Sequence, residues 1–189
     1  SWLEENSGNL PGVDYFLEMY RNYPAGVNAS HSFGYTKEIT AEQLATNKEN
    51  YTQGDFVGYN GIEKTYEDIL HGKKGYQYVL VDSRRRELGN FKGGADDLPP
   101  INGLSAVLTL DMETQLAAEK EFEDKRGALV AIDPTTGEII AFVSAPDYDL
   151  NKFSFITPRD FIATLYNDPA RPLFNRATMS INSPGSTFK

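Results

Sequence analysis

The residues with the clearest chemical potential stand at the C-terminal end of the chain, where Ser186-Thr187-Phe188-Lys189 is its only Ser-x-x-Lys tetrad. On a helix, residues three apart share a face with Cβ atoms about 5–6 Å apart, so a lysine amine can reach the serine hydroxyl. A serine becomes a strong nucleophile when a neighbouring base takes its proton, and a lysine is that base only when it is neutral. The tetrad is therefore compatible with an acylated serine at position 186 and a general base at position 189.

The tetrad alone leaves coincidence open, because a chain of this length contains on the order of one Ser-x-x-Lys by chance. Pro184 and Gly185 suit a tight entry into a helix, which would put Ser186 near backbone N–H groups that stabilise a developing oxyanion. Against this, Lys189 is the last residue, and one helical turn is not stable by itself. The terminal carboxylate beside Lys189 would also favour the charged, non-basic amine.

Other residues that could do chemistry favour structural roles. His31 and His71 have no third ligand at metal-site spacing, and we interpret both as surface or packing residues. The chain has no cysteine, which excludes disulfides, thiolate metal sites and cysteine nucleophiles. Adjacent acids at 4–5 and 96–97 do not face one another, so we interpret them as solvated. We expect no cofactor and no metal ion.

The composition is that of a globular, acidic protein. The 189 residues carry 18 Lys and Arg against 27 Asp and Glu, a formal net charge of −9, and 40% of them are hydrophobic. A negative net charge disfavours a nucleic-acid binder that works by neutralising phosphates. The longest apolar runs, 128–132 and 139–143, are too short to span a bilayer, and the N-terminus is not a signal peptide.

The first half of the chain predicts short, irregular elements. Thr40 and Gln43 fit a capping box and predict a short helix. An apolar stripe on a second helix, which Gly72 can end, consists of Ile62, Tyr66, Ile69 and Leu70. Residues 76–81 predict a strand that enters a turn at 82–86, where we interpret three arginines as solvated and not as an anion site. The Gly- and Pro-rich stretch 93–103 predicts a surface connector.

After the connector the pattern is more regular. Residues 106–110 predict a strand, and Asp111 is predicted to cap a helix that Gly127 stops and that carries Met112, Leu116 and Phe122. Two apolar runs joined by a Pro/Gly turn, 128–132 and 138–144, predict an antiparallel hairpin buried on both faces.

The last part of the chain predicts one more helix and a loop. Thr157 is predicted to cap this helix, with Pro158 at its first position. Its core contacts are expected from Phe161, Ile162 and Leu165. Residues 171–189 predict a loop that ends in the tetrad.

Eight short stretches follow one another along the chain: 10–13 (LPGV), 21–24 (RNYP), 31–35 (HSFGY), 58–72 (GYNGIEKTYEDILHG), 108–111 (LTLD), 133–141 (DPTTGEIIA), 172–177 (PLFNRA) and 184–189 (PGSTFK). In this order they resemble the class B penicillin-binding proteins, and among these the elongation-specific transpeptidases of bacterial cell-wall synthesis. The resemblance covers nearly the whole chain, and the order and spacing of the stretches carry its specificity.

The resemblance implies an α+β fold of two parts. Residues 1–103 would be an irregular, β-rich pedestal, or dimerisation, domain without its N-terminal portion. Residues 104–189 would open the transpeptidase domain with the first hairpin and helices of a helix-covered antiparallel sheet. Ser186 matches the acylated nucleophile of the family and Lys189 its activating base.

The resemblance also implies the partners and the location. Peptidoglycan stem peptides and β-lactams would acylate the serine, and the pedestal would contact other cell-wall synthesis proteins. The region would lie on the periplasmic side of the bacterial cytoplasmic membrane, held by an anchor absent from this chain. No nucleic acid is expected.

The chain departs from the family pattern at both ends. The membrane anchor and the downstream Ser-x-Asn and Lys-Thr-Gly elements are absent from it, so we expect a fragment without transpeptidase activity. One alternative is a self-contained interaction module of the bacterial surface, in which the tetrad is accidental. Another, a sensor or β-lactamase-like domain, leaves the first hundred residues unexplained. An exposed apolar hairpin would favour the enzyme fragment, and a covered one the module.

Overall fold

The structure is a computed structural model that describes residues 20–23, 26–48, 50–84, 86–154 and 156–188. Its elements, in chain order, are α2 (Ser30–Phe33), β1 (Thr36–Glu38), α3 (Ala41–Thr46), β2 (Phe56–Gly58), α4 (Gly61–Thr65), α5 (Glu67–Leu70), β3 (Val79–Val81), β4 (Glu87–Asn90), η2 (Phe91–Gly94), α6 (Met112–Glu121), β5 (Gly127–Ile132), β6 (Ile139–Ala145), η3 (Leu150–Phe153), α7 (Arg159–Asn167), α8 (Arg176–Met179) and η4 (Gly185–Phe188).

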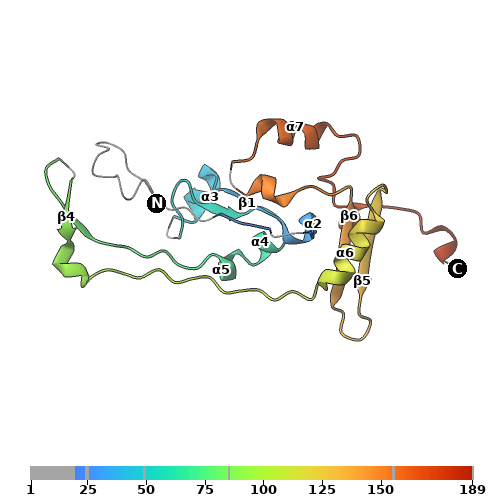
Figure 1. Ribbon diagram of the computed structural model, residues 1–189, viewed down its shortest axis with the longest axis horizontal. Coiled ribbons are helices and arrows are strands. Elements are labelled where there is room, and N and C mark those ends of the chain that lie inside the picture. The colour runs from blue at the N-terminus through green and yellow to red at the C-terminus, as the bar shows by residue number, and fades with distance from the viewer. Residues whose placement is uncertain (1–19, 24–25, 49, 85, 155, 189) are drawn as a thin grey trace.

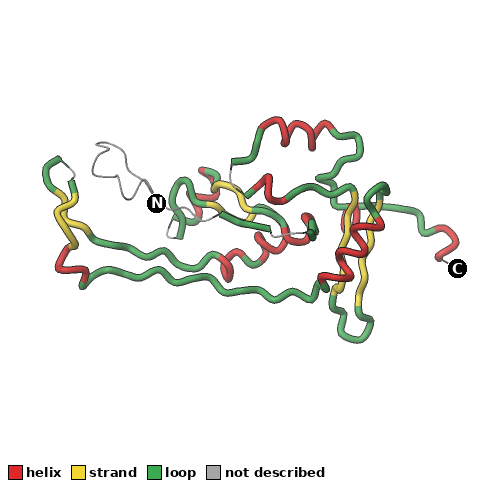
Figure 2. The backbone as a smooth tube through the Cα atoms, in the orientation of Figure 1, coloured by secondary structure: helices red, strands yellow, loops and turns green. Residues whose placement is uncertain are grey.

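The elements form an elongated α+β molecule, as the sequence predicts. In the described part of the chain the strands make two-stranded antiparallel sheets, β1–β2, β3–β4 and β5–β6. An arm ending in β3–β4 extends from one side, and α6 with the hairpin β5–β6 lies on the other (Figures 1 and 2).

The predicted capping box is confirmed at the start of α3. Gln43 N donates to Thr40 Oγ1 (3.3 Å), and Thr40 N donates to Gln43 Oε1 (3.0 Å). Each residue thus satisfies a backbone N–H that the first turn of a helix leaves without an intrahelical partner. Because all of these groups lie within four residues, the sequence pattern was sufficient to place the helix.

The single helix predicted over 62–70 is wrong, because the chain forms two helices, α4 and α5. The break is at Tyr66, with φ −110° and ψ 19°, outside the α-helical region. It coincides with tertiary hydrogen bonds of the next residue, since Glu67 accepts from Gly58 N (2.7 Å) and from the Tyr51 hydroxyl (2.9 Å). Gly72 follows α5 with a φ of +75°, as expected of a glycine that ends a helix.

The arm consists of two lines of backbone that lie side by side (Figure 1). Tyr76 bridges to Leu98, and farther out Val79 of β3 pairs with Asn90 of β4. The strand predicted over 76–81 is therefore confirmed in its outer half. The Gly- and Pro-rich connector does not merely link two regions, because part of it forms the second line of the arm.

The predicted turn after β3 is confirmed, and Asp82 organises it. One carboxylate oxygen of Asp82 accepts from Arg84 N (2.8 Å) and Arg86 N (2.9 Å), and the other accepts from Arg86 Nε (2.7 Å). These bonds hold the pKa of Asp82 below its usual value, with the backbone N–H of Arg86 as the largest cause. An aspartate bonding to the backbone two residues on is a common way to close a turn.

The strand predicted over 106–110 is wrong. These residues form no ladder with a neighbouring strand, although the segment is tied down at both sides. Leu104 N donates to Ile69 O (2.9 Å), and Asp111 N donates to Ile140 O (2.9 Å). These two backbone hydrogen bonds, with one from the Thr109 hydroxyl to Ile139 O (2.7 Å), hold the segment without building a sheet.

Helix α6 begins as predicted and ends earlier. The Asp111 side chain accepts from Thr114 N (2.8 Å), which confirms the cap. Phe122 is the C-cap, so Gly127 does not stop the helix as predicted. Gly127 is instead the first residue of β5 and pairs with Ala145 of β6. The residues between Phe122 and Gly127 connect the helix to the strand.

Of the three apolar residues predicted for α6, Phe122 packs against the hairpin cluster, whereas Met112 and Leu116 are exposed. Met112 and Leu116 are 59% and 38% exposed, whereas Gln115 is 1% exposed. The Gln115 amide pairs with the backbone of one residue of β6, because its Nε2 donates to Phe142 O (2.9 Å) and its Oε1 accepts from Phe142 N (2.7 Å). A polar side chain is buried here because it satisfies the open edge of the strand.

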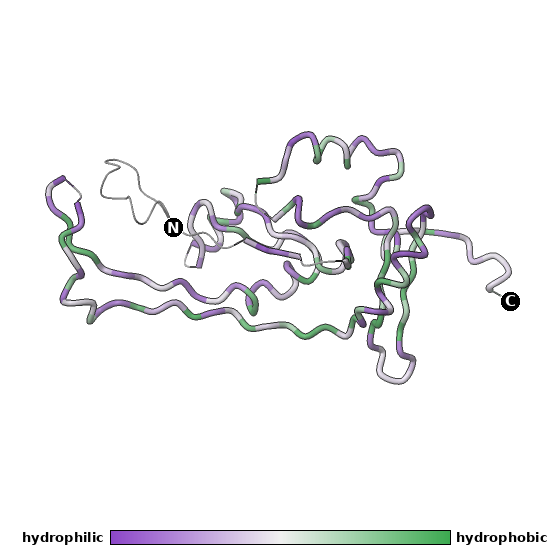
Figure 3. The backbone as a smooth tube through the Cα atoms, viewed as in Figure 1, coloured by the Kyte–Doolittle hydropathy of each residue, from purple (hydrophilic) through white to green (hydrophobic). Residues whose placement is uncertain are grey.

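The two apolar runs form the predicted antiparallel hairpin, β5–β6, with Gly127 opposite Ala145. Burial on both faces is wrong. Val130 and Ile132 are 40% and 54% exposed, whereas Ala141 is fully buried in a cluster with α6. Hydrophobic residues run along both strands (Figure 3), but in the described part of the chain only one face is covered. This exposed apolar face is the outcome that favours an enzyme fragment over a self-contained module.

Two predictions for the last part of the chain need correction. Pro158, with ψ 134°, is the N-cap of α7, so Thr157 does not cap this helix. A proline has no N–H to be satisfied, and its fixed φ suits either position. The loop predicted over 171–189 contains two short helices, α8 and η4.

One hydrophobic cluster joins the two predicted parts of the chain, residues 1–103 (the first region) and residues 104–189 (the second region). Tyr35 follows α2, and it packs with Tyr148, Leu150, Phe153 and Leu165 from the second region. The rings of Tyr35 and Phe153 stack with centroids 4.2 Å apart and an interplanar angle of 23°. Leu165 confirms the expected core contact of α7. Because the cluster draws on both regions, each stabilises the position of the other.

We expect Gln115→Leu to lower the free energy of unfolding, because it leaves the N–H and C=O of Phe142 without the amide partner. The expected loss is about 1–3 kcal/mol, measured by urea unfolding followed by circular dichroism. Leu116→Ala is the matched control, and its exposed side chain should change stability less. A Gln115→Leu protein as stable as the wild type would contradict this role.

Candidate functional site

The predicted nucleophile, Ser186, lies on η4, a single 3-10 turn at the end of an exposed tail (Figure 1). Gly185 precedes it with a φ of +57°. Thr187 closes the turn, because its N–H donates to Pro184 O (3.3 Å) and its hydroxyl donates to the same oxygen. Among the described residues, the Ser186 side chain has no hydrogen-bond partner. Lys189 lies outside the described residues, so the Ser186–Lys189 contact stays a prediction.

Helix α8, which precedes this tail, is fixed by a buried arginine. Arg176 is 6% exposed, and its guanidinium donates to the carbonyl oxygens of Arg171 (3.1 Å) and Phe174 (3.2 Å). Its backbone N–H donates to Ser144 Oγ of β6 (2.9 Å), and Asn175 caps the helix. Burial lowers the pKa of the Arg176 guanidinium, because it disfavours the charged form. The hairpin therefore sets where the Ser186 tail leaves the body of the molecule.

Two carboxylates of the second region hold a turn of the first region. Glu119 of α6 accepts from Asn28 N (3.0 Å) and Ala29 N (2.9 Å). Asp147, just after β6, accepts from Ser30 N (3.3 Å) and from the Ser30 hydroxyl. Ala29 has a φ of +37°, which an alanine seldom adopts. The carboxylate bonds stabilise a conformation that the local sequence does not favour. We call Glu119, Asp147 and residues 28–30 the polar junction.

His31 lies beside the polar junction as a packing residue, as predicted. Its Nε2 is 2.8 Å from Pro172 O, and its ring meets Tyr148 edge-on at 5.4 Å. Burial lowers the pKa of His31; the Arg176 charge acts in the same direction, whereas the Pro172 carbonyl and Asp147 oppose it. The contact joins the first region to the segment that leads into α8.

His71 is also a packing residue. It lies 3.1 Å from Glu67 and its ring contacts Tyr51 at 4.5 Å. In the described part of the chain, no group of three or more His, Cys, Asp or Glu side chains could hold a metal ion.

No role was predicted from the sequence for Gln115, Glu119 or Asp147, and Arg176 was named only within the stretch 172–177. One signal was available for Gln115, because it shares a helical face with Ala118 and Phe122, which pack against the hairpin. A polar residue in register with a buried apolar face often bonds to backbone. The carboxylates gave no such signal, since their partners lie far away along the chain.

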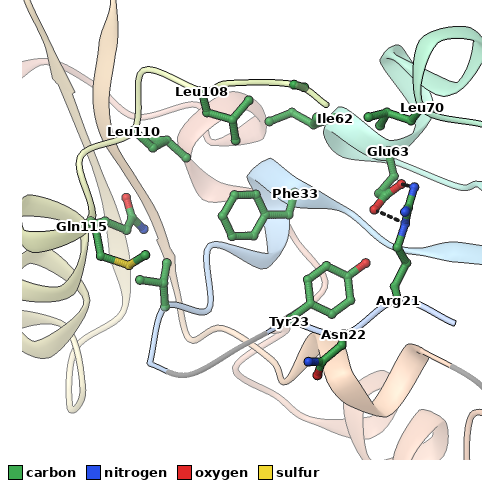
Figure 4. A pocket seen from close by; sticks show the side chains of 13 residues that line it. Arg21, Asn22, Tyr23, Phe33, Ile62, Glu63, Leu70, Leu108, Leu110 and Gln115 are labelled. Carbon is green, nitrogen blue, oxygen red and sulfur yellow. Dashed lines mark hydrogen bonds and ion pairs between the residues drawn. The ribbon is translucent and has the colours of Figure 1, made fainter. Parts of the chain in front are cut away.

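A cavity of about 410 Å³ lies away from the Ser186 tail. Figure 4 shows Phe33 and Tyr23 from the first region opposite Leu108 and Leu110, with Gln115 of α6 at one end. The ion pair of Arg21 and Glu63 stands at the other end. Most of the remaining lining is aliphatic and comprises Val27, Ile62, Leu70, Ala106 and Met112.

Comparison with known families agrees with the sequence resemblance. Residues 1–107 match the family described as the penicillin-binding protein dimerisation domain, and residues 127–189 match the penicillin-binding protein transpeptidase domain. The chain belongs to the penicillin-binding proteins.

Individual relatives point to one branch of this family. The chain is 39% identical over 182 residues to "Peptidoglycan D,D-transpeptidase MrdA" of Acinetobacter baumannii, covering 95% of this chain and 26% of that protein. A solved complex between penicillin-binding protein PBP2 and MreC from Helicobacter pylori matches with a TM-score of 0.71 and 35% identity, over 83% of this chain and 29% of that one. Pseudomonas aeruginosa PBP2 in complex with WCK 5153 matches with a TM-score of 0.69 and 36% identity, over 86% and 32%. The chain thus spans less than a third of the length of these relatives.

The lowered pKa of His31 predicts that acid destabilises the fold. In the unfolded chain the imidazole takes up its proton near pH 6.5, whereas the buried imidazole resists it. The unfolded state therefore gains a proton first as the pH falls, and the free energy of unfolding decreases below about pH 6.5, with a limiting slope of about 1.4 kcal/mol for each pH unit.

His31→Gln removes this titration and keeps a donor for the Pro172 carbonyl. Urea unfolding at pH 7.5, 6.5 and 5.5 should show a steeper loss in the wild type than in the variant. Asp147, whose pKa burial raises, titrates in the opposite sense and interacts with His31, so the difference between the two proteins reports the His31–Asp147 pair. Parallel curves would show that His31 has the same pKa in both states.

Proposed function

We propose that the chain is the part of a peptidoglycan D,D-transpeptidase that carries a pedestal, residues 1–103, and the opening of the catalytic domain, residues 104–189. The observation that carries the proposal is the Ser-x-x-Lys tetrad, which stands at the end of the region that matches the transpeptidase domain. The 39% identity to a relative named as a peptidoglycan D,D-transpeptidase, over 95% of this chain, supports it.

In the proposed reaction, Ser186 Oγ attacks the carbonyl carbon of the penultimate D-alanine of a stem peptide while its proton passes to the neutral amine of Lys189. The bond from that carbon to the nitrogen of the terminal D-alanine breaks, and the proton passes to the leaving amine. An ester on Ser186 remains. An amine of a neighbouring stem peptide then attacks the ester, forming the cross-link and restoring the hydroxyl. A β-lactam would acylate Ser186 by the first of these steps.

The isolated 189-residue chain is proposed to be inactive, on the geometry of its tail. Ser186 is exposed to water on a single turn. A lysine amine in water stays charged and cannot act as a base. Oxyanion stabilisation requires donors that are held in place before the reaction, and a one-turn helix on an exposed tail does not provide them.

We also propose that the first region binds another cell-wall protein, on the extracytoplasmic side of the bacterial cytoplasmic membrane. The Helicobacter pylori relative was solved as a complex with MreC. The arm of this chain offers a suitable surface, because Leu80 and Leu88 are 47% and 69% exposed, and exposed apolar patches commonly mark interfaces. Among the described residues, none of the helices combines the length and apolarity needed to cross a membrane.

A chimera tests the catalytic proposal. In the Acinetobacter baumannii relative, the matching residues are replaced by this chain, and labelling by a fluorescent penicillin is measured on gels. Labelling should be covalent, should vanish in Ser186→Ala, and should slow about 10²–10⁴-fold in Lys189→Ala, as expected on loss of a general base. Ser183→Ala, also exposed, is the matched control and should label normally. The isolated chain should stay unlabelled. Labelling of the Ser186→Ala chimera would refute the assignment.

A binding titration tests the partner proposal. Helicobacter pylori MreC is the probe, and calorimetry measures its affinity for this chain. Leu88→Asp should weaken binding at least about tenfold, because it buries a charge in an apolar contact. Val107→Asp, at a position 96% exposed outside the arm, should not. Equal losses in both variants would show that the arm is not the contact.

A further inference from the structure

The cavity of about 410 Å³ has no role in the proposed acyl transfer, since Ser186 does not line it. It lies where α2, α4 and α5 face residues 104–110, which we call the strap, and the first turn of α6 (Figure 4). Sites that hold small molecules measure about 300–1,000 Å³ and are mostly apolar with a few polar groups. The cavity fits both criteria.

The strap forms one wall with alternate side chains. Ala106, Leu108 and Leu110 line the cavity, whereas Val107 points away and is 96% exposed. The segment that the sequence predicted to be a strand therefore forms a wall of the cavity. Between the tethers at its two ends, the strap makes one side-chain hydrogen bond, from the Thr109 hydroxyl to Ile139 O (2.7 Å), and donates no backbone hydrogen bond to another described residue. A segment held in this way can shift to admit a ligand.

The polar end of the cavity has surplus donors but no net charge. Arg21 Nε lies 2.8 Å from Glu63 Oε1, and Arg21 Nη2 donates to Glu63 Oε2 (2.9 Å). A guanidinium has five N–H donors, and this pair uses two of them. Because the Glu63 carboxylate already balances the charge, a neutral acceptor can bind Arg21, whereas an anion would also meet Glu63.

The opposite end of the cavity offers no donor to a ligand. Both amide hydrogens of Gln115 are used, one on Glu119 Oε1 (2.8 Å) and one on Phe142 O (2.9 Å). A polar ligand group placed there would lose its water without gaining a hydrogen bond to this amide. The part of a ligand nearest α6 must therefore be apolar.

We propose that this cavity binds a neutral, mainly aliphatic small molecule with one carbonyl or hydroxyl oxygen, which accepts a hydrogen bond from Arg21. Its aliphatic part lies between Phe33 and the strap. Such a ligand contacts the first region and the strap together, so its binding stabilises their contact.

The test uses methyl octanoate and octanoate, which share one chain and differ in charge. Each is titrated into the 189-residue protein carrying ¹³C-labelled Ile, Leu and Val methyl groups. Methyl octanoate should give saturable shifts at Ile62, Leu108 and Leu110, and octanoate should bind at least about tenfold more weakly. No saturation up to the solubility limit of the ester, or shifts centred on Leu80 and Leu88 of the arm, would overturn the proposal.

Two variants with a matched control locate the ligand. Ala106→Leu fills the cavity and should weaken methyl octanoate at least about tenfold, whereas Val107→Leu, one residue away and facing solvent, should not. Glu63→Gln leaves the Arg21 charge unbalanced and should reverse the preference, so that octanoate binds more tightly than the ester. This reversal does not depend on the folding of Ala106→Leu. Equal affinity in Ala106→Leu and the wild type, or an unchanged preference in Glu63→Gln, would refute the site.

Discussion

The carboxylates of Glu119 and Asp147 hold the backbone N–H groups of residues 28–30, and the relation between the two regions depends on this contact. Hydrogen bonds to a charged group contribute about 1.5–3 kcal/mol each, and here they stabilise a left-handed alanine at the start of α2. The aromatic cluster around Tyr35 and Phe153 forms beside this turn. His31, one residue beyond the turn, then reaches Pro172.

From this contact a continuous path leads to the exposed serine. Pro172 lies in the segment that the Arg176 guanidinium braces, and the Arg176 N–H is bonded to Ser144 of β6. The same hairpin packs against α6, which supplies Glu119. The body that precedes the tail is therefore closed by bonds between residues far apart in the sequence, whereas the tail itself is exposed. The proposed nucleophile, Ser186, thus lies outside the body that these bonds close.

The apolar surfaces divide by their covering. One face of β5–β6 is buried by α6, and the other carries exposed Val130 and Ile132. The arm likewise exposes apolar side chains on a two-stranded ribbon, which is marginally stable without packing. In contrast, the cavity beside the strap is lined mainly by aliphatic side chains and has the Arg21–Glu63 ion pair at one end. The three surfaces accordingly suit different kinds of contact.

Local sequence is sufficient to predict the features whose partners lie within a few residues or whose pattern is strong. These include the caps at Thr40 and Asp111, the turn at Asp82, the pairing of β5 with β6, and the order of motifs that placed the chain among the penicillin-binding proteins. The Ser186 tetrad is the same kind of local pattern, but Lys189 lies outside the described residues and a contact between them stays a prediction. Four other features depend on long-range contacts: the break at Tyr66, the burial of Gln115, the strap at 104–110 and the polar junction. In each of these, a side chain or backbone group finds its partner far away along the chain, so the local pattern does not identify that partner, and for Gln115 it shows only a shared helical face.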